Sequence, residues 1–83
     1  MKYQARVYVS LKPTVNDPEG LTIRGGLHTL GYDSVESVRS GKYFQITIDA
    51  SSEKEASEKV KSMCKQLLAN PVIEQYEFEV VEI

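Results

Sequence analysis

The residue types best suited to covalent chemistry occur once each in this chain of 83 residues, since Cys64 is the only cysteine and His28 the only histidine. A thiol nucleophile needs a nearby base, and Cys64 with His28 is the only Cys–His combination that the chain offers. Cys64 falls in an apolar helical stripe, where cysteine usually behaves as a small buried hydrophobe. His28 lies off the apolar stripe of another predicted helix, which favours a solvent-facing or interface position. Neither residue indicates catalysis.

Glutamates cluster near the C-terminus, and two of them, Glu77 and Glu79, should project from the same face of a strand. Paired carboxylates can act as acid and base or bind a hard cation. No third oxygen ligand recurs at a loop spacing that would complete such a site. A solvated strand face is therefore the better interpretation.

Two glycine-containing segments have features of anion sites. Arg39-Ser40-Gly41-Lys42 combines backbone amides with two cations, but it lacks a Walker pattern and opens no helix, which favours a plain hairpin turn. Asp17-Pro18-Glu19-Gly20 does open a helix, yet its two acids would repel a phosphate. Helix capping is the better interpretation of that segment.

Composition is that of an ordinary globular domain, with 41% hydrophobic and 27% charged residues. The net charge of -2 and the pI near 5.3 disfavour nucleic acid as a partner. A single cysteine fits a reducing compartment, the N-terminus lacks the apolar core of a signal peptide, and no apolar run approaches the roughly 18–20 residues that span a bilayer. We therefore expect a soluble cytoplasmic protein with no membrane partner.

Alternation of apolar and polar residues predicts four strands. Residues 3–11 alternate throughout, and residues 76–80 form a closing strand. Between them, residues 35–39 and 43–48 are typical of a hairpin around the turn Ser40-Gly41-Lys42.

The first predicted helix begins with Asp17 as N-cap and Pro18 in the first turn, and it ends at Gly31. Its apolar residues are spaced as Ile23, Leu27 and Leu30. Gly25-Gly26 weakens it by about 1 kcal/mol per glycine relative to alanine. The helix must therefore be held by packing, or its bare surface must let something approach closely.

The second predicted helix begins with a capping box, Ser52 and Glu55, and ends before Asn70-Pro71. Its apolar residues form one stripe, which makes it the strongest predicted element. The residues of this stripe are Ala56, Val60, Met63, Cys64, Leu67 and Leu68.

The order strand, helix, strand, strand, helix, strand predicts a single α+β domain over residues 1–83. The expected architecture is a βαββαβ two-layer sandwich, with a four-stranded antiparallel sheet and both helices on one face. The other face stays open and carries two tyrosines, Tyr8 and Tyr43. Tyrosine is enriched at interfaces, so this face is a candidate for sheet-to-sheet or subunit contact.

From near its first residue to its last, the chain resembles PurS, the small subunit of bacterial and archaeal formylglycinamidine ribonucleotide synthetase (phosphoribosylformylglycinamidine synthase). The order and spacing of short segments across the whole length carry the resemblance. The matching segments are Val7-Tyr8-Val9-Ser10-Leu11-Lys12, Asp17-Pro18-Glu19-Gly20, Leu30-Gly31-Tyr32, Val38-Arg39-Ser40-Gly41-Lys42, Met63-Cys64 and Leu67-Leu68-Ala69-Asn70-Pro71-Val72-Ile73-Glu74.

The resemblance implies a non-catalytic subunit that bridges a large ATP-dependent synthetase subunit, PurL, and a glutaminase subunit, PurQ, and supports ammonia transfer between them. The complex would convert formylglycinamide ribonucleotide, ATP and glutamine into formylglycinamidine ribonucleotide, ADP, phosphate and glutamate, the fourth step of purine synthesis. ATP and Mg would be used by the complex, with no cofactor or metal bound by this chain. The resemblance also implies self-association as a dimer or a dimer of dimers.

Candidate partner-binding residues follow from the matching motifs and the open sheet face. At the ends of elements, the motif residues permit either structural capping or subunit contact. The full set is Tyr8, Asp17, Pro18, Glu19, Gly20, Arg39, Gly41, Lys42, Tyr43, Asn70 and Pro71.

Two other functions are compatible with the same sheet plan. One is a small-ligand-binding regulatory domain of ferredoxin-like plan. The other is an RNA-binding module, because Gly41-Lys42-Tyr43-Phe44-Gln45-Ile46 has a passing likeness to the aromatic third-strand motif of RNA-recognition domains. The second aromatic of that motif is missing at Gln45, and the acidic pI also disfavours RNA.

Overall fold

A computed structural model describes all 83 residues and contains a single antiparallel sheet. β1 (Lys2–Leu11) lies in the centre, with β2 (Gly41–Asp49) and β3 (Glu74–Glu82) on either side. All three strands contain the ranges that alternation predicts. Two of them, β2 and β3, are therefore edge strands.

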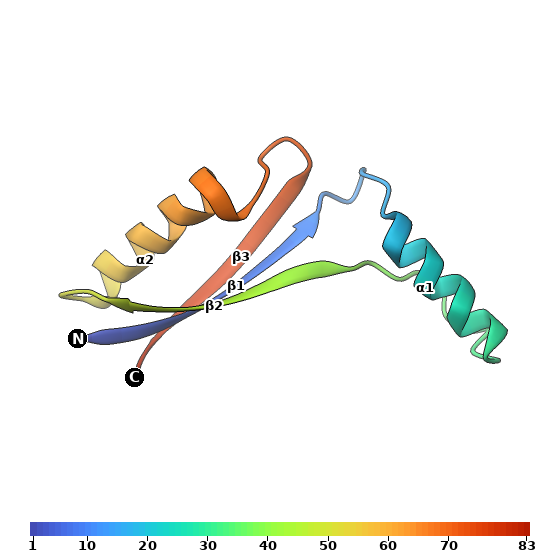
Figure 1. Cartoon of the computed structure of the whole chain (residues 1–83), viewed down its shortest axis with the longest axis horizontal. Helices are drawn as coiled ribbons and strands as arrows, with labels where there is room; N and C mark the ends of the chain where they lie inside the picture. The colour runs from blue at the N-terminus through green and yellow to red at the C-terminus, as the bar shows by residue number, and fades with distance from the viewer.

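The helices lie in two different parts of the molecule (Figure 1). α2 (Glu53–Met63) continues directly into a π-helical turn, η1 (Cys64–Leu68), and covers one face of the sheet. α1 (Pro18–Thr29) lies beyond the end of the sheet at which β1 finishes and β2 begins. Neither helix is long and apolar enough to cross a membrane.

The core lies between α2 and the inner face of the sheet. It is small, since only 11 of the 83 residues are buried, and two of those are the polar Asp17 and the glycine Gly20. The remaining nine form the apolar core: Tyr3, Ala5, Val7, Val9, Ala50, Ala56, Val60, Cys64 and Ala69.

The predicted four-stranded sheet with two covering helices is wrong for the single chain, because residues 35–39 form no strand and α1 lies off the sheet. The physical reason is that α1 itself binds this segment. Arg24 Nε donates to the carbonyl of Glu36 at 2.9 Å, and His28 Nε2 lies 2.8 Å from the carbonyl of Val35. The segment therefore runs beside α1 instead of pairing with β2.

The molecule is consequently elongated, measuring 51 × 28 × 14 Å, with a radius of gyration of 16.3 Å. A compact domain of this length would have a radius of gyration of about 12 Å. We call residues 1–11 and 41–83 the body, residues 18–38 the arm, and residues 12–17 with Arg39 and Ser40 the neck.

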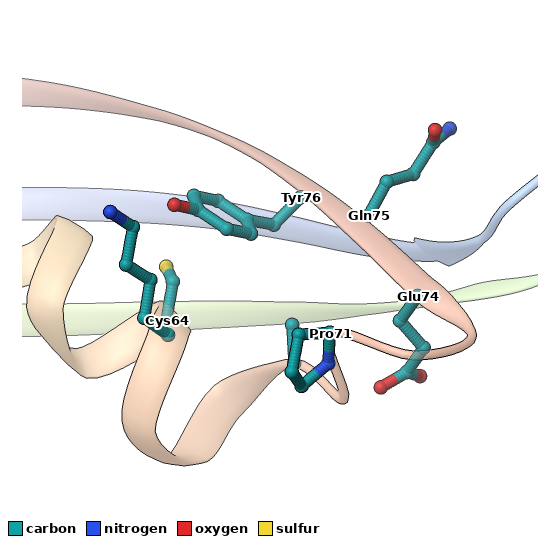
Figure 2. A pocket seen from close by; sticks show the side chains of 7 residues that line it. Cys64, Pro71, Glu74, Gln75 and Tyr76 are labelled. Atoms are coloured by element: carbon teal, nitrogen blue, oxygen red, sulfur yellow. The ribbon is translucent and has the colours of Figure 1, made fainter.

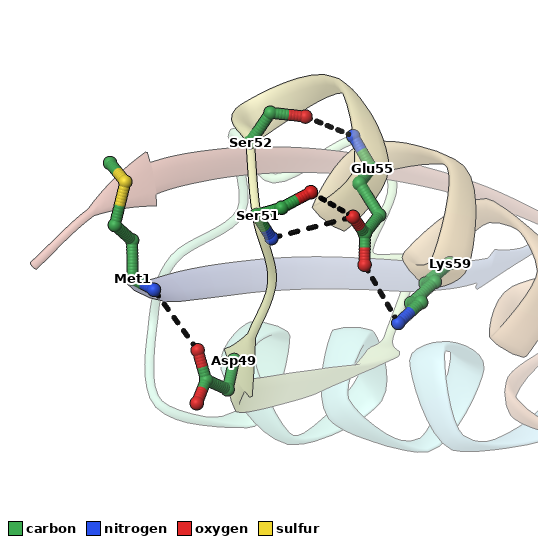
Figure 3. Close-up of polar contacts among 6 residues, drawn as sticks. All are labelled: Met1, Asp49, Ser51, Ser52, Glu55 and Lys59. Carbon is green, nitrogen blue, oxygen red and sulfur yellow. Dashed lines mark hydrogen bonds and ion pairs between the residues drawn. The ribbon is translucent and has the colours of Figure 1, made fainter.

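Both helices begin as their sequences predict. Asp17 Oδ1 accepts from the Gly20 amide at 3.0 Å, and Ser52 Oγ accepts from the Glu55 amide at 3.1 Å. In a capping box the Glu55 carboxylate would accept from the Ser52 amide. Here it accepts instead from the amide and hydroxyl of Ser51 (Figure 3). It also pairs with Lys59 at 3.0 Å. After α1, Gly31 has a φ of 101°, the left-handed conformation expected at the end of a helix.

The second helix departs from its predicted stripe at η1. The Ala69 amide bonds to the Cys64 carbonyl, five residues back, and this wider turn changes the direction in which later side chains point. Cys64 stays buried and Leu68 half-buried, but Leu67 is 83% exposed. The prediction that Leu67 belongs to the same apolar stripe as Cys64 is therefore wrong.

Candidate functional site

Residues suited to covalent chemistry do not meet in the structure. Cys64 lies in the core of the body, where burial raises the pKa of its thiol and so favours the unreactive protonated form. His28 lies in the arm, half-buried against the Val35 carbonyl. The cysteine and the histidine therefore lie in different regions of the molecule.

The outer face of the sheet is open and carries the two predicted tyrosines. Tyr8 and Tyr43 sit opposite each other on β1 and β2, with ring centroids 5.2 Å apart, and both are about half exposed. Desolvation, followed by the negative charge of Glu79, raises the pKa of Tyr8. Glu79 also accepts from Arg6 at 3.3 Å. This face offers aromatic surface with polar edges, which suits contact with another protein.

The acidic pair Glu77 and Glu79 does lie on this outer face, as predicted, and both side chains are exposed. No group of three or more His, Cys, Asp or Glu side chains is placed to hold a metal ion. The pair is part of a solvated strand face.

Several motif residues meet at the neck, where Asp17 is the one buried charged side chain of the molecule. Besides capping α1, its Oδ2 accepts from the amide of Ser40 at 2.7 Å and from the Ser40 hydroxyl at 3.2 Å. The backbone bonds from Ser40 and then Gly20 hold the pKa of Asp17 below its usual value. Asp17 therefore ties the start of α1 to the residue that precedes β2.

Arg39 of the neck and Gly20 of the arm add to this junction. Arg39 Nη2 donates to the carbonyls of Lys12 at 3.1 Å and Val15 at 2.8 Å, so the outgoing and returning segments are fastened together. A Cβ on Gly20 would lie 2.1 Å from the Val38 carbonyl oxygen, which leaves no room for any other residue. These contacts tie the start of the arm to the neck and to the segment that leads into β2.

Other candidate residues lie around the same neck. Gly41 also has a tight environment, because a Cβ there would lie 2.6 Å from the Val9 carbonyl oxygen. Lys42 Nζ lies 3.6 Å from Glu74 Oε2. Pro18 and Glu19 are exposed in the first turn of α1. These residues lie around a hollow of about 270 Å³. Five of the candidate residues line it: Asp17, Pro18, Glu19, Gly41 and Lys42.

Asn70 and Pro71 lie elsewhere, in the loop between η1 and β3, and they shape it. Asn70 Oδ1 accepts from the Val72 amide at 3.0 Å, and the Asn70 amide donates to Glu74 Oε1 at 2.7 Å. The Pro71 carbonyl accepts from Lys12 Nζ at 2.8 Å. Beside this loop, a groove of about 550 Å³ opens between η1 and β3.

The arm presents apolar side chains without a partner in its own chain. Leu21, Ile23, Leu30 and Tyr32 are between 41% and 74% exposed. A Cβ added to Gly25 or Gly26 would meet no atom within 4 Å, so no contact within the chain explains these glycines. An uncovered apolar helix of this kind marks a protein interface.

Three comparisons identify related proteins. The family model for PurS, described as phosphoribosylformylglycinamidine (FGAM) synthase, matches residues 4–82. Phosphoribosylformylglycinamidine synthase subunit PurS of Synechocystis sp. is 49% identical over 81 residues, which cover 98% of this chain and 81% of the relative.

Solved structures agree with the sequence relatives. PurS of Bacillus subtilis is 48% identical with a TM-score of 0.86, covering 96% of this chain and 99% of that chain. A chain in the structure of PurLQS from Thermotoga maritima is 32% identical with a TM-score of 0.90, covering 98% of this chain and 99% of that chain. With this match in sequence and in fold over nearly its whole length, the chain belongs to the PurS family.

Proposed function

We propose that the chain is the non-catalytic assembly subunit of phosphoribosylformylglycinamidine synthase in purine biosynthesis. In this role it joins the synthetase subunit PurL to the glutaminase subunit PurQ and supports ammonia transfer between them, in the cytoplasm. ATP and Mg belong to the complex and not to this chain. The observation that carries the proposal is the uncovered arm, which gives a subunit a surface for assembly.

The proposed self-association uses the arm to complete the sheet of a second copy. α2 packs mainly over β1 and β3, so the inner residues of β2, which are Phe44, Ile46 and Ile48, remain half-buried. The apolar side chains of α1 from a second copy would cover them. Exchange of an identical element between protomers is an efficient route to a dimer.

The outer edge of β2 is the free edge better suited to pairing. β3 carries four glutamates, which protect an edge against pairing, whereas β2 has charged residues only near its ends, at Lys42 and Asp49. Residues 35–40 continue directly into β2 (Figure 1). In a two-fold dimer, this segment from each copy would pair antiparallel with residues 43–48 of the other.

Such a dimer contains the βαββαβ plan twice, with the fourth strand and the second helix of each sheet supplied by the partner. The outer face with Tyr8 and Tyr43 stays open in this arrangement. This outer face is the proposed contact between dimers. The exposed motif residues Pro18 and Glu19 lie at the junction of arm and body.

Reconstitution tests the function. Glutamine-dependent synthesis of formylglycinamidine ribonucleotide by PurL and PurQ should rise strongly when this chain is added, while the chain alone should hydrolyse neither ATP nor glutamine. Unchanged activity on addition would refute the assembly role. Steady turnover by the isolated chain, abolished by one of its own substitutions, would refute the non-catalytic assignment.

Light scattering of two double variants tests the mode of self-association. Ile23→Asp/Leu30→Asp should leave a monomer, because it places charges on the arm. Tyr8→Lys/Tyr43→Lys should leave the dimer intact and block only larger assemblies. If the tyrosine variant is monomeric and the arm variant is dimeric, the primary contact is sheet-to-sheet and the exchange of arms is wrong.

A further inference from the structure

The groove between η1 and β3 lies in the body, beside the edge strand that is not assigned to self-association. It is lined by side chains from both sides: Cys64 and Pro71 from the helical side, and Tyr76, whose ring points from β3 toward Cys64 (Figure 2). Gln75 points to the other side of the strand. The volume of about 550 Å³ is large enough for one or two side chains of another protein.

The segments that form the groove also carry exposed apolar side chains. Leu67 in η1 is 83% exposed and Val72 in the following loop is 76% exposed, with Ile73 at 40%. Leu67 reaches solvent because of the π-helical turn, a rare element that is frequent at functional sites. Single exposed apolar residues are common on protein surfaces, but here three large ones lie within seven positions. Such a group is more typical of an interface.

The backbone that carries these side chains is held rigidly. Asn70 fixes the Val72 amide, and the Asn70 carbonyl accepts from the Ile73 and Glu74 amides. On the other side, the Lys12 amide donates to the Ile73 carbonyl at 2.8 Å. An apolar patch whose backbone is already ordered loses little conformational entropy when it binds, which is the property of an interface anchor.

Two charged residues line the groove, Lys65 and Glu74. Glu74 is paired with Lys42, whose Nζ lies 3.6 Å from Glu74 Oε2. Lys65 forms no ion pair, so it is the one lining charge that is free to meet a partner. Charge complementarity therefore favours a partner segment that carries a carboxylate.

We infer that this groove, with Leu67 and Val72 beside it, binds a segment of a larger subunit of the synthase in which an apolar side chain stands next to an Asp or Glu. The apolar side chain occupies the groove against Tyr76, and the carboxylate meets Lys65. This inference rests on the proposed function, because the partner is a subunit of the same complex.

The test measures binding of full-length variants to PurL and PurQ, together with the mass of the variants alone. Leu67→Asp/Val72→Asp should keep the dimer mass of the wild type but bind the larger subunits roughly thirtyfold more weakly or worse. Ile83→Asp is the matched control, since it also adds an aspartate at an exposed apolar residue, 63% exposed and far from the groove. It should bind as the wild type does.

Lys65→Glu supplies a second variant that does not depend on the apolar patch. Its association with the larger subunits should be slower than that of the wild type, and the difference should shrink as salt is added. Should the double aspartate variant fail to fold, Leu67→Ser/Val72→Ser tests the same patch with a milder change.

Each outcome separates the groove from the general function. Wild-type binding by the folded patch variants would overturn the groove as a docking site while leaving the assembly role intact. A loss of the dimer in these variants would show that a second copy occupies the groove, which also overturns the inference. Failure of the wild type itself to bind PurL or PurQ would refute the proposed function and the inference together.

Discussion

The two α-helices have almost the same length, 12 residues in α1 and 11 in α2, and both begin at a side-chain cap, yet only one is packed within the chain. α2 buries Ala56 and Val60 against the sheet, whereas the only buried residue of α1 is Gly20. Local capping therefore determines where a helix begins and does not determine what it packs against. In the proposed dimer, the uncovered helix obtains its apolar contacts from another chain.

The two regions should also differ in how their stability arises. An isolated helix of about 12 residues is marginal in water, and two internal glycines weaken α1 further. The hydrogen bonds of Asp17 and Arg39 at the neck and the contacts of Arg24 and His28 hold the arm within one chain. The body has an apolar core of its own, so it should stay folded when the arm loses its partner.

The largest contrast is expected from a charge placed in each region. Val60→Asp puts a carboxylate in the fully buried core and should prevent folding. Ile23→Asp changes a side chain that is 41% exposed, so the body should keep its circular dichroism spectrum while the dimer weakens. Equal unfolding by both variants would show that the arm and the body are a single cooperative unit.

Two glycine substitutions should change stability less than these charges do, and in opposite directions. Gly20→Ala should lower the melting temperature by several degrees or more, because the new Cβ would meet the Val38 carbonyl oxygen at 2.1 Å. Gly25→Ala has open space and should stabilise α1 by up to about 1 kcal/mol. Thermal unfolding at a fixed concentration compares them. A lower melting temperature for Gly25→Ala would show that a partner packs on the bare helix surface.

Within the second helical segment, Cys64 and Leu67 provide the next comparison. Cys64→Ala removes a fully buried side chain and should lower the free energy of unfolding by about 1–2 kcal/mol without loss of synthase activity. Leu67→Ala, at an 83% exposed position, should leave the free energy of unfolding unchanged. Denaturant titrations measure both. A Cys64→Ala variant of native stability but without activity would reveal a functional thiol.

The sequence predicts those elements whose signals are local. The caps at Asp17 and Ser52, the left-handed Gly31 and the alternation of β1 are all present where expected. Sheet membership of residues 35–39 could not be predicted, because their apolar and polar residues fit a strand equally well in one chain or between two. The competing contacts from Arg24 and His28 are tertiary and leave no pattern in the sequence.

The candidate site was predictable in part. Motif residues at the neck were expected either to cap or to bind a partner, and Asp17, Gly20 and Arg39 have structural roles there. Leu67 and Val72 were missed, because a continuous α-helix would have placed Leu67 in the core. One signal was available: Leu67, Leu68 and Ala69 are three consecutive apolar residues, more than one face of a helix can bury.

The smallest expected effect is the pH dependence that Glu55 gives to the body. Its hydrogen bonds from the Ser51 hydroxyl, and then its contacts with Lys59, lower its pKa from 4.5 to about 2. Between these two values, the unfolded chain takes up a proton at this residue and the folded chain does not. The stabilisation is therefore fully present above pH 4.5, falls as the pH falls, and is lost below about pH 2.

Acid titrations of three chains can isolate this contribution. Asp17, whose pKa is also lowered, adds a dependence of the same sign from the neck, so the wild type alone does not assign the slope to Glu55. Glu55→Gln removes its titration and should flatten the fall in unfolding free energy between pH 4.5 and about 2. Glu58→Gln is the matched control, because this exposed glutamate of the same helix forms no hydrogen bond or ion pair, and it should keep the wild-type slope. If Glu55→Gln also keeps that slope, the acid sensitivity comes from Asp17 at the neck, and the arm, not the body, is the region that acid loosens first.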